Sequence, residues 1–324
     1  MKNKLKNIKL DPSTIAPIIL LALLMTVYTI TTDIFFTGTN FLNILRQVSI
    51  TGIMAVGVTK VILLGQIDLS IATIMAFSGM IASGLSMGMY LGLPPLPVEL
   101  CILIALILGA LIGFINGMAV AKLAIPGFMA TLAMMFIIDG FMLMLTNAQP
   151  IFGLSDRMMF LGSGRVFNIP VIIIVFLVVL IIGMFVLKYS VFGRNLYAIG
   201  GNKETARISG INVTSNVVAA FMVCSILASL AGVLMVGRIG SGQVTAGVGL
   251  QLPPIAAAVL GGASLLGGKG TLFGTLLGVL TMGVLVNGLN LLGQGSAVQW
   301  LVTGLVLFLA VAFNMIMSRK SRMS

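Results

Sequence analysis

Uncharged, apolar stretches of roughly 20 residues, the length a helix needs to cross about 30 Å of hydrocarbon, recur along nearly the whole of this chain. A backbone in lipid must satisfy its hydrogen bonds within its own segment, so such runs are expected to be helices rather than strands. Only 8% of the residues are charged, whereas a soluble chain is about one quarter charged. The sequence therefore predicts an all-α, polytopic integral membrane protein.

The apolar runs predict ten transmembrane helices, which form a single transmembrane domain over residues 1–324. The first run is too long, and too poor in small residues at its end, to be a cleaved signal peptide, so it is expected to be retained. The predicted spans are 15–35, 44–64, 70–91, 98–120, 127–147, 168–188, 214–237, 250–266, 271–292 and 297–317.

The lysines and arginines predict the orientation of the chain in the membrane. Fourteen of the eighteen fall on one side when the N-terminus is placed in the cytoplasm, Lys60 among them. The other four are Arg46, Arg157, Arg165 and Arg238. This orientation predicts cytoplasmic N- and C-termini. The net charge of +11 is spread over short loops at span ends, where topology and anionic membrane lipid account for it, so no nucleic-acid partner is expected.

The chain offers little material for catalysis. It contains no histidine and only seven carboxylates, and Cys101 and Cys224 follow no metal-ligand or disulfide spacing. The closest approach to a phosphate-binding loop, 263–270, lacks the leading glycine and the Ser or Thr after its lysine. We therefore expect a non-catalytic protein without a metal site or a cofactor of its own, and any energy from ATP has to come from another polypeptide.

The loop FGRNLYAIGGNKETARISGIN, residues 192–212, carries the signals of a short helix over 203–209. Asn202 is expected to be the N-cap, Glu204 lies in the first turn, and Gly210 is expected to end the helix in a left-handed conformation. A helix of about seven residues is too short to be stable alone in water.

Two interpretations of this short helix are open from the residues alone. It packs against the spans and a protein partner, or it rests on lipid headgroups with Arg194, Lys203 and Arg207 facing phosphate. Either arrangement would supply the packing that the isolated helix lacks.

The 192–212 loop resembles the signature cytoplasmic loop of the permease subunits of ribose-type monosaccharide ABC importers, in the superfamily that also includes branched-chain amino acid importers. The resemblance covers most of the chain and implies a type II-like ABC importer permease. It implies that residues 202–210 form the coupling helix, which sits in a groove of the cytoplasmic ATPase. The residues expected to couple to the ATPase are Arg194, Asn202, Lys203, Glu204, Arg207 and Gly210. Three more stretches resemble that family in the same order: GVTKVILLGQIDLSIATIMAFSG (57–79), NGMAVAKLAIPGFMATLAM (116–134) and IAAAVLGGASLLGGKGTLFGTLLGVLTMGVLVNGLNLLG (255–293).

The resemblance also implies partners and a location. Two copies of this subunit, or one copy with a related permease, would form the pore in the bacterial cytoplasmic (inner) membrane. An ABC ATPase subunit would bind ATP and Mg on the inner side, and a periplasmic or lipid-anchored sugar-binding protein would deliver a monosaccharide or a similar small polar solute. The alternative is a stand-alone secondary transporter or channel, which would need an intramembrane ionisable relay for which only Asp139 is available.

Asp139 and the segment 250–257 depart from the usual pattern of the family. Many relatives carry Arg-Gly where this chain has Asp139 and Gly140, and the segment lacks the Glu-Leu-Asp that commonly precedes its alanines. Asp139 either faces the translocation path or a gate, or is satisfied by a neighbouring helix or by the outer headgroups. A neutral sugar needs no charged site, so the candidates for the path are mainly neutral polar side chains. They are Asn116, Asp139, Gln251, Asn287 and Asn290.

Asp68 and two sets of glycines have structural interpretations. Asp68, with Ser70, is expected to cap the third helix. Glycines at four-residue spacing let neighbouring helices approach closely in lipid, where there is little hydrophobic drive for association. These sets are Gly109, Gly113 and Gly117 in the fourth span, and Gly270, Gly274 and Gly278 in the ninth.

Overall fold

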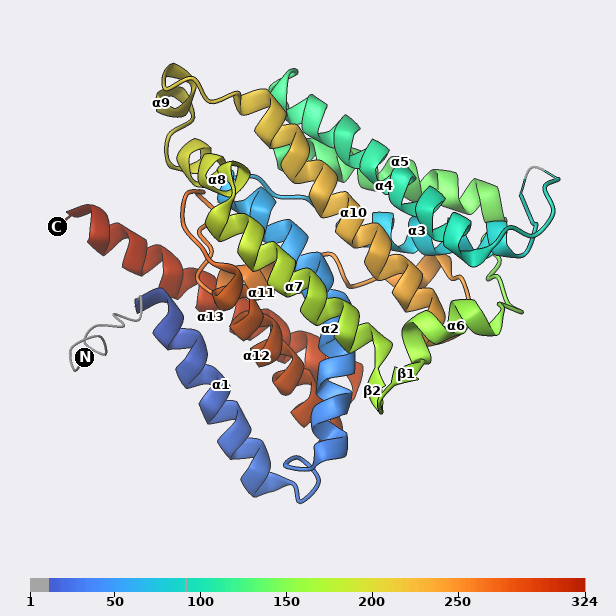
Figure 1. Cartoon of the computed structure of the whole chain (residues 1–324). Coiled ribbons are helices and arrows are strands. Elements are labelled where there is room, and N and C mark those ends of the chain that lie inside the picture. Colours follow the sequence, from blue (N-terminus) through green and yellow to red (C-terminus); the bar gives the residue numbers. More distant parts are fainter. Residues whose placement is uncertain (1–11, 91, 324) are drawn as a thin grey trace, which may run out of the picture.

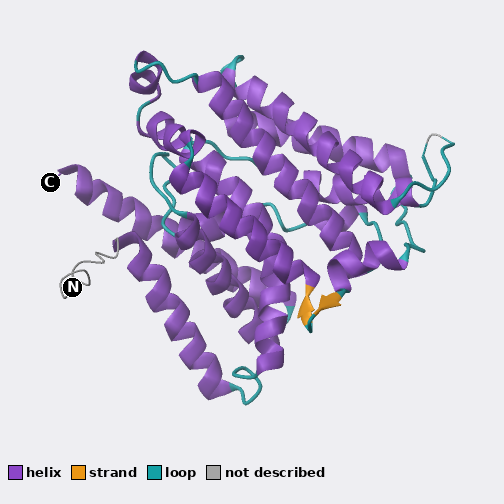
Figure 2. Ribbon diagram, in the orientation of Figure 1, coloured by secondary structure: helices purple, strands orange, loops and turns teal. Residues whose placement is uncertain are grey.

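The computed structural model describes residues 12–90 and 92–323, and most of this part of the chain is helical (Figures 1 and 2). The long helices are α1 (Pro12–Thr31), α2 (Gly38–Leu63), α3 (Ile71–Ser86), α4 (Val98–Ala121), α5 (Gly127–Thr146), α7 (Val171–Tyr189), α10 (Val213–Ile239), α12 (Leu272–Leu291) and α13 (Ser296–Met323). The short elements are α6 (Asp156–Ser163), α8 (Val191–Gly201), α9 (Lys203–Ile208), the 3-10 helix η1 (Val244–Gly247), α11 (Leu252–Leu260) and a small hairpin of β1 (Arg165–Val166) and β2 (Ile169–Pro170).

The prediction of an all-helical, polytopic membrane protein is confirmed. Among the described residues, six helices are long and apolar enough to cross a membrane, namely α2, α4, α5, α7, α10 and α12. Shorter apolar stretches lie in α1, α3 and α13 and between Val244 and Leu260. The count of ten spans stays a prediction.

The predicted eighth span, 250–266, is wrong as one continuous helix. Its helical part is α11, which has nine residues and carries Pro253 and Pro254 at its start. Proline lacks an N–H and is favoured where a helix begins, so the pair marks the start of α11. Gly262, with a φ of 90°, follows its end. The chain before α11 is the η1 turn, so this region crosses only part of the bundle as helix.

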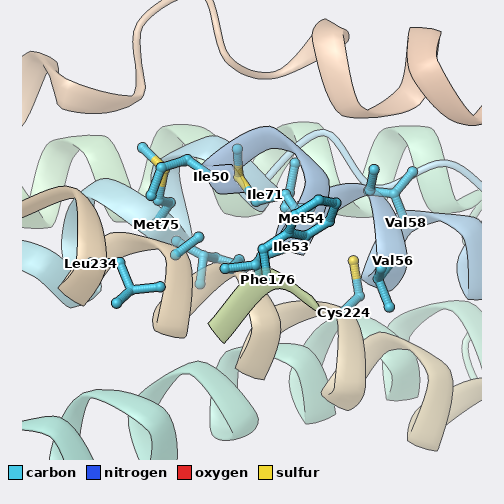
Figure 3. Packing of buried hydrophobic residues seen from close by; sticks show 14 of the residues in the cluster. Ile50, Ile53, Met54, Val56, Val58, Ile71, Met75, Phe176, Cys224 and Leu234 are labelled. Atoms are coloured by element: carbon cyan, nitrogen blue, oxygen red, sulfur yellow. The ribbon is translucent and has the colours of Figure 1, made fainter. Parts of the chain in front are cut away.

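Helix α10 is the centre of the packing, in contact with α2, α3 and α4. Figure 3 shows the apolar cluster at this centre, where Phe176 of α7 is fully buried near Ile53 and Met54 of α2. The Phe176 ring lies against Gly52, at a place where any larger side chain would overlap it. Apolar side chains from helices far apart in the sequence therefore meet in one core.

The expected close approach of α4 through its glycines is confirmed. A Cβ on Gly113 would lie 2.6 Å from the Phe221 carbonyl oxygen of α10, and one on Gly117 would lie 2.6 Å from Val218 Cα. The second set needs a correction, because Gly270 lies in the loop before α12 with a φ of 143°. A glycine is required there by the backbone conformation rather than by a helix contact.

Gly274 and Gly278, the other members of that set, do pack between helices. Both lie in α12, where Gly274 is in contact with the carbonyl of Gly261 and Gly278 with the carbonyl of Ala257 in α11. Close packing of α11 on α12 therefore depends on the absence of side chains at these two positions.

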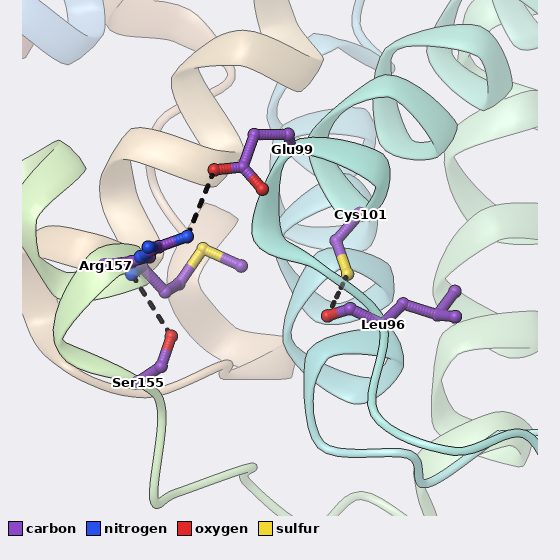
Figure 4. Close-up of polar contacts among 6 residues, drawn as sticks. Leu96, Glu99, Cys101, Ser155 and Arg157 are labelled. Carbon is purple, nitrogen blue, oxygen red and sulfur yellow. Dashed lines mark hydrogen bonds and ion pairs between the residues drawn. The ribbon is translucent and has the colours of Figure 1, made fainter.

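Two of the four basic residues predicted to lie outside, Arg157 and Arg238, lie at one end of the bundle, while Lys2, Lys4, Lys6 and Lys9 lie outside the described residues, so the orientation stays a prediction. At the end that carries α6, Arg157 forms an exposed ion pair with Glu99, 3.9 Å apart, as Figure 4 shows. Such a pair contributes little to stability. Arg238, at the same end, donates to the Arg46 carbonyl at 3.2 Å. Lys60 lies in the last turn of α2, within the predicted span 44–64, and is only 3% exposed.

Candidate coupling and translocation sites

Helix α8 follows α7 directly through a capped turn. The Ser190 hydroxyl oxygen accepts a hydrogen bond from the Gly193 N–H at 3.0 Å, which satisfies one of the free donors at the start of the helix. Gly193, Leu196 and Ile199 are its buried residues, at a spacing of three. One face of α8 therefore packs against the bundle, while Arg194 lies on its exposed side.

Two contacts hold α8 against other parts of the chain, and a third joins the segments that it meets. The Tyr197 hydroxyl donates to the Gly270 carbonyl at 2.7 Å. The Gly200 Cα lies against the Leu63 carbonyl at the end of α2, so closely that a Cβ would overlap it. The same carbonyl accepts from the Gly268 N–H at 2.9 Å. These five residues, which we name the α8 junction, join α8 to α2 and to the loop before α12.

The Tyr197 phenol is partly buried in this junction. Burial raises the pKa of Tyr197 above its ordinary value, because desolvation disfavours the phenolate. The hydroxyl is therefore protonated at neutral pH and acts as a donor to the Gly270 carbonyl.

Helix α9 has the predicted N-cap. The Asn202 side-chain oxygen accepts from the Thr205 N–H at 2.9 Å. The helix has six residues, close to the predicted length, and Glu204 lies in its first turn. A cap of this kind stabilises a helix by about 1 kcal/mol, a large share for one this short.

The predicted stop at Gly210 is also confirmed, with a φ of 83°. The Gly210 N–H donates to the Arg207 carbonyl at 3.0 Å, and the Ile211 N–H donates to the Ala206 carbonyl at 3.1 Å. This pair of bonds is the Schellman motif, which requires a left-handed residue at the glycine position. Both ends of α9 are thus fixed by local sequence.

The side chains of α9 face away from the bundle. Within this helix Ala206 alone is buried, while Lys203, Glu204 and Arg207 are exposed. Ile208 is 85% exposed, an apolar side chain at the tip of a charged helix. Figure 1 shows α9 beyond α8, at the outermost part of this end of the molecule. The arrangement leaves a short helix, capped at both ends, exposed at this end of the molecule.

The side chains predicted to line the path are not gathered into one place within this chain. Asn116 of α4 is buried and donates to the Ser70 hydroxyl at 3.0 Å. Asn287 of α12 is buried and exchanges two amide hydrogen bonds with Asn40 of α2, at 3.0 and 2.9 Å. Both amides therefore have partners that tie helices together.

The other three candidates are more accessible. Asn290 is exposed and its side-chain oxygen accepts from Gln299 at 2.7 Å. Gln251 is half-exposed, directly before α11. Asp139 is half-buried in α5, beside the Thr73 hydroxyl of α3. A path role stays a prediction for all five.

The expected capping of α3 by Asp68 is wrong, because Ser70 is the N-cap residue and no side chain caps this helix; Asp68 instead bonds to Ser70 itself. One carboxylate oxygen accepts from the Ser70 N–H at 2.9 Å and from the Ser70 hydroxyl at 2.6 Å. The second oxygen of this fully buried carboxylate has no partner among the described residues. With Asn116, these groups form a buried polar network between α3 and α4.

Comparison with known families matches residues 40–311 to the family of permease components of branched-chain amino acid transport systems. This chain belongs to that family. It is 42% identical over 303 residues to a ribose import permease protein of Escherichia coli K12, covering 92% of this chain and 91% of that protein. It is similarly 42% identical over 302 residues to a ribose import permease protein of Bacillus subtilis 168, covering 93% and 92%.

More distant relatives share the same family. An L-arabinose ABC transporter permease protein of Azospirillum brasilense is 35% identical over 280 residues, which cover 86% of this chain and 81% of that protein. No solved structure matches this permease. The predicted resemblance to ribose-type importer permeases is therefore confirmed.

Sequence reasoning missed α8 of this permease. It placed only one helix in the 192–212 loop, whereas the structure has α8 and α9 on either side of Asn202. A signal was present, because Ser190 is a good N-cap and Gly193, Leu196 and Ile199 repeat at helical spacing. The short length and the two glycines at the end of α8 obscured it.

Proposed function

We propose that this chain is the membrane-spanning, non-catalytic permease subunit of an ATP-driven ABC importer that passes a monosaccharide, ribose-like, or a similar small polar solute into the cytoplasm. The names of its relatives support the sugar. The observation that carries the mechanism is the exposed face of α9, with both ends of the helix capped.

In this proposal α9 docks into a groove of a separate ATPase subunit. Ile208 would bury its exposed side chain there, and Lys203, Glu204 and Arg207 would set the orientation, because charges at a rim favour one register over others. ATP and Mg bind only to that partner. Its movement reaches the spans through the α8 junction, since Asn202 alone separates α9 from α8.

The remaining parts of the importer follow from the same proposal. A second copy, or a related permease, completes the pore. A periplasmic or lipid-anchored sugar-binding protein docks at the end that carries α6, and the α8–α9 end with both termini faces the cytoplasm in the bacterial inner membrane. The basic residues Lys122, Lys188 and Lys269, near the α8–α9 end, support this orientation.

The proposal is tested in proteoliposomes that contain this permease and its cognate ATPase, with a ribose-loaded binding protein outside. We expect loaded binding protein to stimulate both ATP hydrolysis and uptake. Ile208→Asp should lower both by about tenfold through loss of docking, while Ile208→Leu keeps them. Wild-type stimulated hydrolysis in Ile208→Asp would remove α9 from the coupling role.

Orientation has its own measurement. In a background with Cys101 and Cys224 replaced, a cysteine at Lys203 should be shielded from an impermeant thiol reagent in intact cells, and one at Arg157 should react. Labelling at position 203 from outside would reverse the topology. Uptake that follows an ion gradient without ATP would instead support a secondary transporter.

A further inference from the structure

The segment between α10 and α11 enters the bundle as non-helical chain. Its start is fixed at the α6 end, where Gly242 and Ile151 exchange backbone hydrogen bonds of 2.9 and 2.8 Å, and Gly242 packs against Ser83 of α3. Gly247, at the end of η1, is in contact with the Ala72 carbonyl of α3. Ser83 and Ala72, the α3 residues that these two glycines contact, are eleven residues apart, which corresponds to roughly 16 Å along the helix axis. The η1 turn therefore lies deep within the membrane-spanning part.

The deepest part of this segment is exposed in the single chain. Val248 is 67% exposed, and Thr245 and Gly249 are exposed as well. Among the described residues no group donates to the carbonyls of Val248 or Gly249. Unsatisfied backbone groups facing lipid cost several kcal/mol each, so irregular chain at this depth occurs where it is covered by protein or lines a water-filled space.

An aromatic side chain stands beside this exposed edge. A Cβ on Gly249 would lie 3.9 Å from the indole ring of Trp300 in α13. Trp300 is 72% exposed and is the only tryptophan of the chain. An aromatic face carries partial negative charge and a large apolar area, which suits the C–H face of a sugar ring. The neighbouring carbonyls suit its hydroxyl donors.

Asp139 is carried by a helix, α5, that is in contact with the same turn. The η1 helix is in contact with both α3 and α5, which lie side by side in Figure 1. Asp139 of α5 faces Thr73, the neighbour in sequence of Ala72, against which Gly247 packs. A carboxylate therefore lies on a helix that packs against the turn, and an indole lies beside Gly249 at the end of the turn.

We infer that the η1 turn, residues 244–249, and Trp300 form a contact site for a neutral polyhydroxy solute within the translocation path, with Asp139 at its edge. This inference rests on the proposed function and deepens it. The free carbonyls accept hydroxyl donors from the solute, and the indole covers its apolar face. No other tryptophan competes for that contact, since the chain has one.

The single tryptophan provides the direct test. Full-length permease in lipid nanodiscs is titrated with ribose, and the emission of Trp300 is followed against an equal osmolality of glycine betaine, which has no hydroxyl groups. We expect a saturable change with ribose alone. Equal responses to both solutes, or no response to either, would overturn the site. Quenching by brominated lipid with no response to ribose would make Trp300 an interfacial anchor instead.

A second measurement tests the turn without tryptophan. In the background that lacks Cys101 and Cys224, Val248→Cys should react with a charged methanethiosulfonate about tenfold faster than Ile137→Cys, a matched control that is 62% exposed on the apolar helix α5 and is expected to meet lipid. Loaded binding protein and ATP should change the rate at position 248. Equal rates at both positions, or a disulfide between copies at 248 with no labelling in any state, would contradict a path role.

Transport separates this inference from the proposed function. Trp300→Leu should lower the sugar taken up per ATP hydrolysed by about tenfold, with stimulated hydrolysis within about twofold of wild type, because the variant changes the path and leaves α9 intact. Trp300→Phe should recover part of the loss. Absence of stimulated hydrolysis in the wild type would defeat the proposed function. Normal uptake per ATP in Trp300→Leu would contradict the solute contact site and leave the proposed function standing.

Discussion

Helices α8 and α9 are neighbours in the sequence and opposites in the structure. Helix α8 buries one face, and its end lies in backbone contact with Leu63 and Gly268. Helix α9 buries only Ala206 and is held by its own caps. The two helices of this loop therefore differ in what holds them: α8 packs on the spans, whereas α9 is exposed, as the proposed docking to an ATPase requires. The following variants test that difference.

The largest effect is expected at the α8 junction. Gly200→Val should destabilise the permease by several kcal/mol, because its side chain would overlap the Leu63 carbonyl. The measurement is the thermal unfolding midpoint in detergent, together with the yield of inserted protein. Gly201→Val is the matched control, since a Cβ at Gly201 would have nothing within 4 Å. Equal midpoints for the two variants would show that α8 is not fixed at Gly200.

Gly210→Val should damage coupling more than folding. A Cβ at Gly210 meets nothing within 4 Å, but its φ of 83° costs a β-branched residue about 1–2 kcal/mol. The last turn of α9 is then misplaced, so stimulated hydrolysis and uptake both fall while solute affinity of the binding protein is unchanged. Gly210→Asn, which tolerates this conformation, should keep most activity. Wild-type coupling in Gly210→Val would contradict the role of α9.

Tyr197→Phe removes one hydrogen bond from the junction and nothing else. We expect a loss of about 1 kcal/mol in stability, from the missing bond to the Gly270 carbonyl. If α8 transmits movement to the loop before α12, uptake per ATP should fall as well, while docking of the ATPase stays normal. A drop in docking would place Tyr197 at the partner interface instead.

The smallest effect is expected for Glu204→Gln. The carboxylate lies in the first turn of α9, is exposed, and forms no ion pair among the described residues. Its interaction with the helix dipole is weak and screened, so stimulated hydrolysis should change by less than about twofold. A much larger loss, rescued by a charge reversal on the ATPase, would show a direct ion pair with that partner.

Local sequence was sufficient for α9 and insufficient for α8. Asn202 and Gly210 fix the ends of α9 through bonds to residues within five positions, so the printed sequence contains the necessary information. The position of α8 depends on Leu63 and Gly270, which are far away in the sequence. No local sequence pattern predicts that the Tyr197 hydroxyl will donate to the Gly270 carbonyl.

The translocation candidates show the same limit. A search for polar side chains selected Asn116 and Asn287, and the structure gives both a buried partner on another helix. Trp300 and the η1 turn were not among the candidates, because neither a tryptophan in an apolar run nor a glycine-rich loop carries the polar side chains by which a translocation path was sought. Their proximity depends on how α11 and α13 pack.

The sequence by itself determined the membrane class, most of the long helices, the permease family and both ends of α9. Apolar length and capping residues act over a few turns of chain, and that range is what a sequence displays directly. Only the tertiary structure decided that the predicted eighth span is a turn and a half-length helix, that α8 is joined to α2, and that Trp300 lies beside Gly249. Those outcomes depend on contacts between distant segments, where the close approach of two backbones at a glycine determines which groups meet.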